Sequence, residues 1–195
     1  QISSLASTAD QKVEISAPQG LLTGNLRLDS VVLSDREGVY ARINGIAVDW
    51  SPTALLTGTF RADLVSASTI EFDRTPLPSE QRAKQESGSF SLPIAVDIKN
   101  LTFDDIKLGE ALAGRPFELV ASGNAKASSK DMAANIAVHR KDVPQAGITA
   151  DFTYVPEQNV LQLKANLSEP QGGMLANLLA LPGAPAVSLD IDGQG

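Results

Sequence analysis

Apolar and polar residues alternate through almost the whole chain, and this period of two is typical of strands that have one buried face. The alternating runs are bounded by Gly, Pro, Asn or Asp, and they cover residues 12–16, 24–34, 39–50, 59–73, 91–104, 116–127, 133–141, 147–155, 159–167 and 187–192. Several of these runs are longer than the usual strand of about 5 to 6 residues. The pattern therefore predicts an all-β protein whose long strands need either a large sheet or a bend.

The alternation changes phase inside several of these strands. In ARINGIAVDW (41–50) the apolar residues move from odd to even positions at Asn44 and Gly45. The same slip occurs at 29–30 and 99–100, and a weaker copy lies within 62–67. One extra residue at each slip restores the apolar face after a bulge, which bends the strand. If the bulges align in neighbouring strands, they crease the whole sheet along one line.

Two architectures satisfy this pattern. The first is a long bent antiparallel sheet that forms an elongated open apolar groove, with short apolar helices between its strands. The second is a β-sandwich whose strands cross from one sheet to the other. The alternation alone does not separate the two.

Short apolar helical segments lie between the predicted strands. SPTALLTG (51–58) has Pro at the first helical position and Gly after the last, which are ordinary start and stop signals. LGEALAG (108–114) and GGMLANLLALPG (172–183) repeat the arrangement. We expect these helices to cover the ends or open sides of the apolar core, and the alternative is that they gate a path for lipid.

The composition excludes several classes of protein. The 195 residues are 43% hydrophobic and 20% charged, with a net charge of −7 and no cysteine. Such a chain is neither broadly disordered nor suited to nucleic acid, because phosphate binding needs clustered Lys and Arg. No disulfide or thiolate chemistry is possible without cysteine.

The sequence offers little catalytic chemistry. His139 is the single histidine, and the alternation places it on the polar side of its strand. Asp104, Asp105 and Glu110 lack the regular spacing of a calcium loop, and we interpret them as a solvated strand end. We therefore expect no enzyme activity, no metal site and no cofactor.

Residues 12–76 resemble the segment that follows the membrane anchor in the TamB family, which belongs to the AsmA-like superfamily. The shared pattern is a glycine-led strand, Leu-x-Asp, an LSD-x-x-G turn, and a strand that ends in Asp-Trp, Ser-Pro and ALL-x-G. In this chain it comprises Gly24, Leu28, Asp29, Leu33 to Asp35, Gly38, Asp49 to Pro52, Ala54 to Leu56 and Gly58. IKLGEALAGRPFELVASGNA and SEPQGGMLANLLALPGAPAVSLDIDGQG also resemble the family, and the match is weakest over 128–165.

The resemblance implies a periplasmic protein tethered to the inner membrane of a Gram-negative bacterium. Such proteins fold a long sheet into a groove, partner the outer-membrane barrel protein TamA, and are linked to phospholipid transport and outer-membrane protein assembly. It implies that the anchor lies before this chain and that TamA binds a region beyond it. Residues 1–11 would then be a helical tail, 12–74 a first groove section, 75–90 an exposed loop, and 91–195 a second section of the same sheet.

The expected ligands are phospholipid acyl chains, because an apolar groove can shield them from water. The residues expected to line the groove are Leu26, Leu28, Val31, Leu33, Ile43, Ile46, Val48, Ile94, Val96, Ile98, Leu101 and Phe103. A structural or chaperone scaffold is the alternative, in which exposed sheet edges hold nascent outer-membrane strands by edge pairing.

Overall fold

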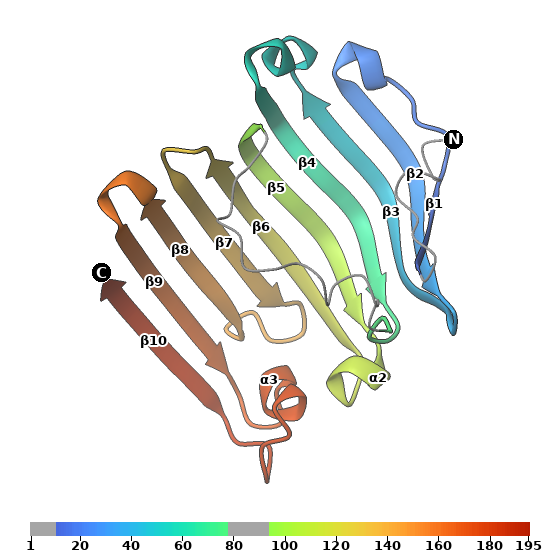
Figure 1. Ribbon diagram of the computed structural model, residues 1–195. Coiled ribbons are helices and arrows are strands. Elements are labelled where there is room, and N and C mark those ends of the chain that lie inside the picture. Colours follow the sequence, from blue (N-terminus) through green and yellow to red (C-terminus); the bar gives the residue numbers. More distant parts are fainter. Residues whose placement is uncertain (1–10, 78–93) are drawn as a thin grey trace.

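A computed structural model describes residues 11–77 and 94–195, and they form one ten-stranded sheet. The strands lie side by side in the order of the sequence, from β1 at one edge to β10 at the other (Figure 1). The strands are β1 (Gln11–Ile15), β2 (Asn25–Asp35), β3 (Gly38–Trp50), β4 (Thr59–Phe72), β5 (Ala95–Leu108), β6 (Phe117–Ala127), β7 (Met132–Arg140), β8 (Gly147–Val155), β9 (Val160–Glu169) and β10 (Val187–Gln194).

Helical structure in the described residues is confined to short segments between strands. Three are 3₁₀ turns, namely η1 (Leu21–Thr23), η2 (Pro52–Thr57) and η4 (Pro156–Gln158). Two are short α-helices, α2 (Glu110–Ala113) and α3 (Met174–Leu178). Both α-helices lie at one end of the strands, and the three 3₁₀ turns lie at the opposite end (Figure 1).

The sheet is open and mixed, and this confirms the single bent sheet over the β-sandwich. All neighbouring strands are antiparallel except β4 and β5, which are parallel. β5 therefore begins at the same end of the sheet as β4, and the N–H of Ala95 donates to the carbonyl of Gly58 there at 2.9 Å. The sheet is therefore largely antiparallel, as predicted, with one parallel junction. The predicted tail 1–11 and loop 75–90 fall largely outside the described residues.

One crease crosses four strands. On β2 and β3 the facing pairs Leu28–Ile46 and Val31–Ile43 lie three residues apart on both strands, so both carry the extra residue and the register is kept. The crease continues through 67–70 on β4 and 103–106 on β5. The slips predicted at 29–30 and 44–45 therefore lie opposite each other.

A second crease crosses only β4 and β5, where 62–65 and 98–101 span the extra residue. At this second crease the neighbouring strands β3 and β6 have no extra residue. The register between β3 and β4 therefore shifts beside Trp50, and the register between β5 and β6 shifts between Ile98 and Leu101. The slip at 99–100 therefore does not lie on the same line as the slips at 29–30 and 44–45. A sequence pattern gives the position of a bulge along its own strand, whereas pairing decides which bulges meet.

Gly45 lies on the first crease and has a left-handed backbone conformation, with φ of +62°. A side chain there would be strained, and its Cβ would lie 2.5 Å from Oγ of Ser68 on β4. Glycine thus lets β3 bend while β4 passes close beside it.

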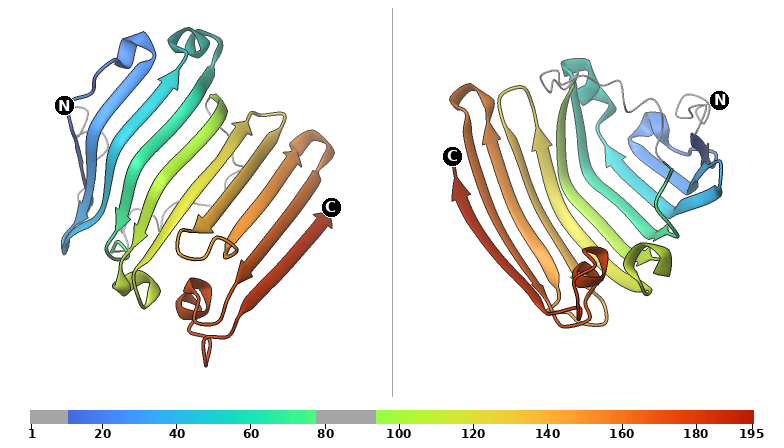
Figure 2. Two further views of the ribbon diagram at one scale, coloured as in Figure 1. Left: turned by 180° about the vertical axis from the view of Figure 1, so that it is seen from behind. Right: turned by 60° about the horizontal axis from the view of Figure 1, so that its bottom comes forward.

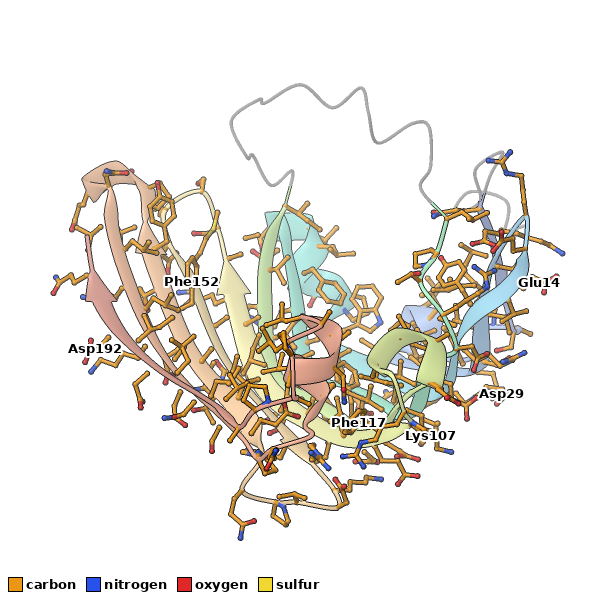
Figure 3. The ribbon with its side chains drawn as sticks, turned by 90° about the horizontal axis from the view of Figure 1, so that it is seen from below. Glu14, Asp29, Lys107, Phe117, Phe152 and Asp192 are labelled. Atoms are coloured by element: carbon orange, nitrogen blue, oxygen red, sulfur yellow. The ribbon has the colours of Figure 1, made fainter. Side chains whose placement is uncertain are left out.

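The sheet has one apolar and one polar face. Seen along the strands, the sheet is bent, with Phe117 and Phe152 on its hollow side and Glu14, Lys107 and Asp192 on the outside (Figure 3). We call the hollow, apolar side the inner face. The bend is also visible in the tilted view of Figure 2.

Candidate functional site

The inner face is continuous across the sheet, because facing residues in neighbouring strands point to the same side. One complete row of such partners runs through Leu28, Ile46, Ala67, Phe103, Ala121, Val138, Ile148, Leu167 and Leu189. A parallel row runs through Leu26, Val48, Val65, Leu101, Gly123, Ile136, Ala150, Ala165 and Ile191. The strand register therefore joins short apolar stripes into one extended surface.

The register brings together all but one of the predicted groove residues. Those placed on the inner face are Leu26, Leu28, Val31, Leu33, Ile43, Ile46, Val48, Val96, Ile98, Leu101 and Phe103. Ile94 precedes β5, and no strand pairing fixes its side chain; it is 40% exposed. The bulges make this grouping possible, since strict alternation would have sent half of each stripe to the polar face.

No second layer covers the inner face in the described part of the chain. The buried apolar residues of the strands are small or lie near α2 and α3, and no large side chain among the described residues is completely buried. A ten-stranded sheet with an apolar face normally packs it against helices or another sheet. In residues 11–77 and 94–195, only α2 and α3 cover part of that face, at one end of the strands.

The two halves of the inner face differ in exposure. In the creased strands β2 to β5 the large apolar side chains are buried or half-buried. In β7 to β10 the inner face carries exposed large apolar residues, which are Ile136, Ile148, Leu161, Leu189 and Ile191. Sequence analysis predicted strands here but assigned none of these residues to the site. Their alternating pattern was the available signal.

Two helices cover one end of the inner face. The helices α2 and α3 contact each other, and Ala113 and Ala176 are buried between or beneath them. Phe117 on β6 lies below the guanidinium groups of Arg115 and Arg140, at 4.5 and 4.9 Å from its ring centroid. This end contains the best-packed apolar residues of β6, and it confirms that short apolar helices separate the strands.

Glu169 fixes the position of α3. Its buried carboxylate accepts hydrogen bonds from the backbone N–H groups of Met174 and Leu175, the latter at 2.7 Å. The same carboxylate lies 3.7 Å from Nη1 of Arg140, which is itself buried and forms a bidentate pair with Asp142. The hydrogen bond from Arg140 lowers the pKa of Asp142.

A small cavity of about 100 Å³ lies beneath α3. Leu119, Val138, Ile148, Leu167 and Met174 give it an apolar wall, and Arg140 and Glu169 border it. Its apolar wall belongs to the inner face, so it extends that surface rather than forming a separate site.

A second ion pair lies at the same end of the sheet and joins the segment after β4 to the end of β2. Arg74, just after β4, donates through both terminal nitrogens to Asp35 at the end of β2. Leu77 N–H also donates to Asp35, at 2.9 Å. The hydrogen bond with Arg74 is the main reason that the pKa of Asp35 lies far below its ordinary value.

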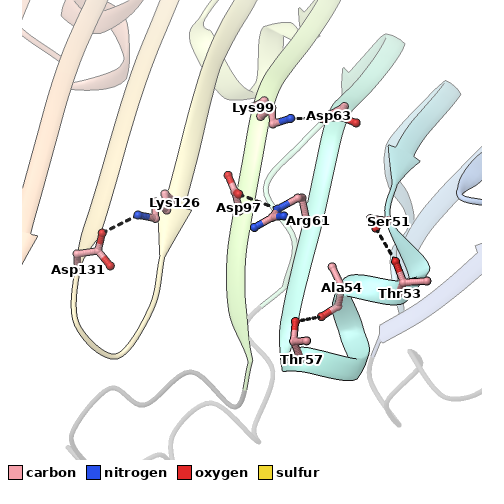
Figure 4. Close-up of polar contacts among 10 residues, drawn as sticks. All are labelled: Ser51, Thr53, Ala54, Thr57, Arg61, Asp63, Asp97, Lys99, Lys126 and Asp131. Atoms are coloured by element: carbon pink, nitrogen blue, oxygen red, sulfur yellow. Dashed lines mark hydrogen bonds and ion pairs between the residues drawn. The ribbon is translucent and has the colours of Figure 1, made fainter.

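The outer face carries ion pairs between neighbouring strands. Arg61 pairs with Asp97 at 3.1 Å, and Lys99 pairs with Asp63, both between β4 and β5 (Figure 4). Arg61, Lys99 and Asp63 are more than half exposed and Asp97 is 29% exposed, so each such pair contributes little to stability. Their main effect is to keep this face hydrated and therefore distinct from the inner one.

His139, Asp105 and Glu110 lie apart and form no reactive cluster. His139 faces Val120 and Gly147, on the outer face. Asp105 accepts a hydrogen bond from Lys141 at 2.9 Å, which lowers its pKa, and Glu110 begins α2. Within residues 11–77 and 94–195, no group of three or more His, Asp or Glu side chains is placed to hold a metal ion. Within the same ranges, no helix is long and apolar enough to cross a membrane.

Comparisons with protein-family models, curated proteins and solved structures found no match to this chain. The function is therefore inferred from the geometry of the two faces of the sheet.

Proposed function

We propose that this chain is a periplasmic section of a TamB-like bridge between the inner and outer membranes, and that its inner face carries phospholipid acyl chains. The observation that supports this most is a continuous apolar face over which the described residues form no second layer. Each CH₂ group that an acyl chain removes from water contributes about 0.8 kcal/mol. Lipid movement along such a face needs no bond chemistry.

The size of the sheet suits one section of a longer path. With neighbouring strands about 4.8 Å apart, ten strands span roughly 45 Å across the sheet. This length accommodates acyl chains but does not by itself bridge two membranes. We therefore assign the contact with TamA and the tether to the inner membrane to other parts of the protein.

The first test is native mass spectrometry of the chain purified from bacterial membranes in mild detergent. We expect bound phospholipid in the wild-type chain. Ile136→Asp should remove the lipid while leaving the fold intact, because this side chain is already 44% exposed. Ala137→Asp is the matched control, since it adds the same charge one residue away on the outer face.

Loss of lipid in Ile136→Asp but not in Ala137→Asp would support carriage on the inner face. Charged replacements in the creased half, Ile46→Asp and Val96→Glu, extend the test along the proposed path and need a thermal unfolding control. Absence of lipid from the wild-type chain, together with no uptake of added fluorescent phospholipid, would overturn the proposal.

The second candidate is a scaffold that holds nascent outer-membrane strands, and the exposed edge strand β10 favours it. All residues from Ser188 to Gln194 are exposed, and β10 pairs only with β9 among the described strands. Such an edge can accept another strand through its backbone. Under this second function, photo-crosslinkers in β10 would capture outer-membrane strands. Under the first function, a photo-crosslinker at Ile136 would capture lipid.

A further inference from the structure

The same four residues, Leu-Leu-Thr-Gly, occur twice in the chain, at 21–24 and at 55–58. The first copy forms η1 and leads into β2, and the second ends η2 and leads into β4. Because β2 and β4 both pair antiparallel with β3, they run in the same direction, and the two turns lie at the same end of the sheet (Figure 1). This is the end opposite α2 and α3.

The residues that flank the two turns bring them close together. Trp50 N–H donates to the carbonyl of Gly24 at 2.7 Å, which joins the end of β3 to the end of η1. A Cβ atom on Gly24 would lie 3.2 Å from Cδ of Pro52, the first residue of η2. The turns therefore lie side by side, and we call the four leucines that they carry, Leu21, Leu22, Leu55 and Leu56, the leucine tip.

The leucines of this tip are the most exposed large apolar side chains at this end of the sheet. Leu22 and Leu56 are 88% and 87% exposed, and Leu21 and Leu55 are each 41% exposed. A cluster of exposed leucines on the described surface is unfavourable in water, so its presence at two repeated turns points to a binding role.

The two threonine hydroxyls beside the tip are hydrogen-bonded within their own turns. The Thr23 hydroxyl donates to the Gly20 carbonyl at 3.1 Å, and the Thr57 hydroxyl donates to the Ala54 carbonyl at 2.8 Å. Entry of the tip into an apolar medium would thus leave neither hydroxyl without a partner.

Charge is absent from both turns and balanced just below them. Neither η1 nor η2 has an acidic residue in its first turn or a basic residue in its last. Arg27 pairs with Asp49 at 2.8 Å, and Arg61 pairs with Asp97 at 3.1 Å, where β2 and β4 begin. An occupant of this tip is therefore recognised by apolar contact and not by charge.

We propose that the leucine tip docks the protein on a lipid surface by inserting into the interface of a membrane. Amphipathic elements at membrane interfaces place leucine and aromatic side chains among the acyl chains. A protein partner is the weaker explanation, because binding hot spots between proteins favour Trp, Tyr and Arg over Leu. The inference is independent of whether the inner face carries lipid.

The test measures binding of the full chain to phosphatidylcholine vesicles by flotation. Because the tip is uncharged, we expect similar binding to neutral and anionic vesicles and little loss as the salt concentration rises. Burial of one leucine strengthens partitioning by about tenfold, so Leu22→Asp with Leu56→Asp should weaken it by about a hundredfold or more. Leu179→Asp is the matched control, because Leu179 is 64% exposed at the end of α3.

A fluorescent probe separates docking through the tip from binding through the inner face. The chain has no cysteine, so Leu56→Cys and Leu179→Cys each carry a single environment-sensitive label. We expect a blue shift on adding vesicles at position 56 and none at 179. Failure of the wild-type chain to float, equal binding of the double Asp variant, or equal shifts at both positions would overturn the proposal.

Two further results would also overturn the docking proposal. Self-association that depends on Leu22 and Leu56 without vesicles would assign the tip to a second copy of the chain. Lipid in native mass spectra with no vesicle flotation would leave the proposed function standing and refute the docking alone.

Discussion

The creased half of the sheet, β2 to β5, and the regular half, β6 to β10, both alternate apolar and polar residues, but the exposure of their large apolar side chains differs. In the creased half the extra residues at 29–30 and 44–45 bend the strands, and the inner face there has no exposed large apolar side chain. In β7 to β10 alternation is unbroken, and residues such as Ile136 and Leu189 stay 44% and 50% exposed.

The difference teaches that a bend can partly replace a second layer. A crease brings the two ends of each strand toward the same space, so their side chains cover one another. A regular strand cannot do this and leaves its apolar side open. We therefore expect the creased half to be the more stable part and the regular half to be the more accessible to a ligand.

The largest expected effect on the free energy of unfolding comes from an Asp in the creased half, compared with the same substitution in the regular half. Ile46→Asp should lower the free energy of unfolding by about 3 kcal/mol, because the carboxylate loses water among half-buried neighbours. Ile136→Asp should cost less than about 1 kcal/mol, since the side chain already contacts solvent. Urea denaturation followed by circular dichroism gives both values. Equal losses would show that the two halves are packed alike.

The crease itself is broken by a side chain at Gly45. Gly45→Ala should cost about 2 kcal/mol, from the left-handed backbone and the contact with Ser68. Gly58→Ala is the control for the backbone alone, because Gly58 has a φ of +73° and nothing within 4 Å of its Cβ position. Ser68→Gly should restore part of the loss in Gly45→Ala but none in Gly58→Ala. Identical behaviour of the two glycine variants would rule out close approach at the crease.

Acid should weaken the creased half through Asp35. The pKa of Asp35 is lowered in the folded chain by Arg74, so its stabilising contribution is complete above its unfolded pKa of about 3.9 and is lost as the pH falls toward the folded value. Thermal unfolding temperatures of the wild type should therefore drop below about pH 4. The Asp35→Asn variant should be less stable at neutral pH but show a shallower drop on acidification. An unchanged slope would mean that Asp35 is not stabilised by this pair.

The smallest effect is expected on the outer face. Lys99→Ala removes the ion pair with Asp63, whose two side chains are 57% and 69% exposed. The change in unfolding free energy should be below about 0.5 kcal/mol and should vanish at high salt. A larger loss by urea denaturation would show that outer-face pairs help to hold the parallel junction of β4 and β5.

Much of the fold follows from local patterns in the sequence. Alternation and turn residues predicted nearly all strands, and the slips at Asp29 and Asn44 predicted bulges. The helical signals around Pro52 and Gly114 marked the short segments between strands. These features depend on neighbouring residues along the chain, where backbone geometry and solvent preference act directly.

Pairing between distant residues was decided only in the tertiary structure. Parallel pairing of β4 with β5, the second crease through Lys99 and Asn100, and the exposure of Ile136 and Leu189 depend on which strands meet and on what covers them. The buried Arg140 and Glu169 likewise acquire their roles from elements far apart in sequence. The sequence by itself determined one apolar face for each strand; only the assembled sheet decided where that face bends, where it is covered and where it stays open, because these properties arise from contacts between strands.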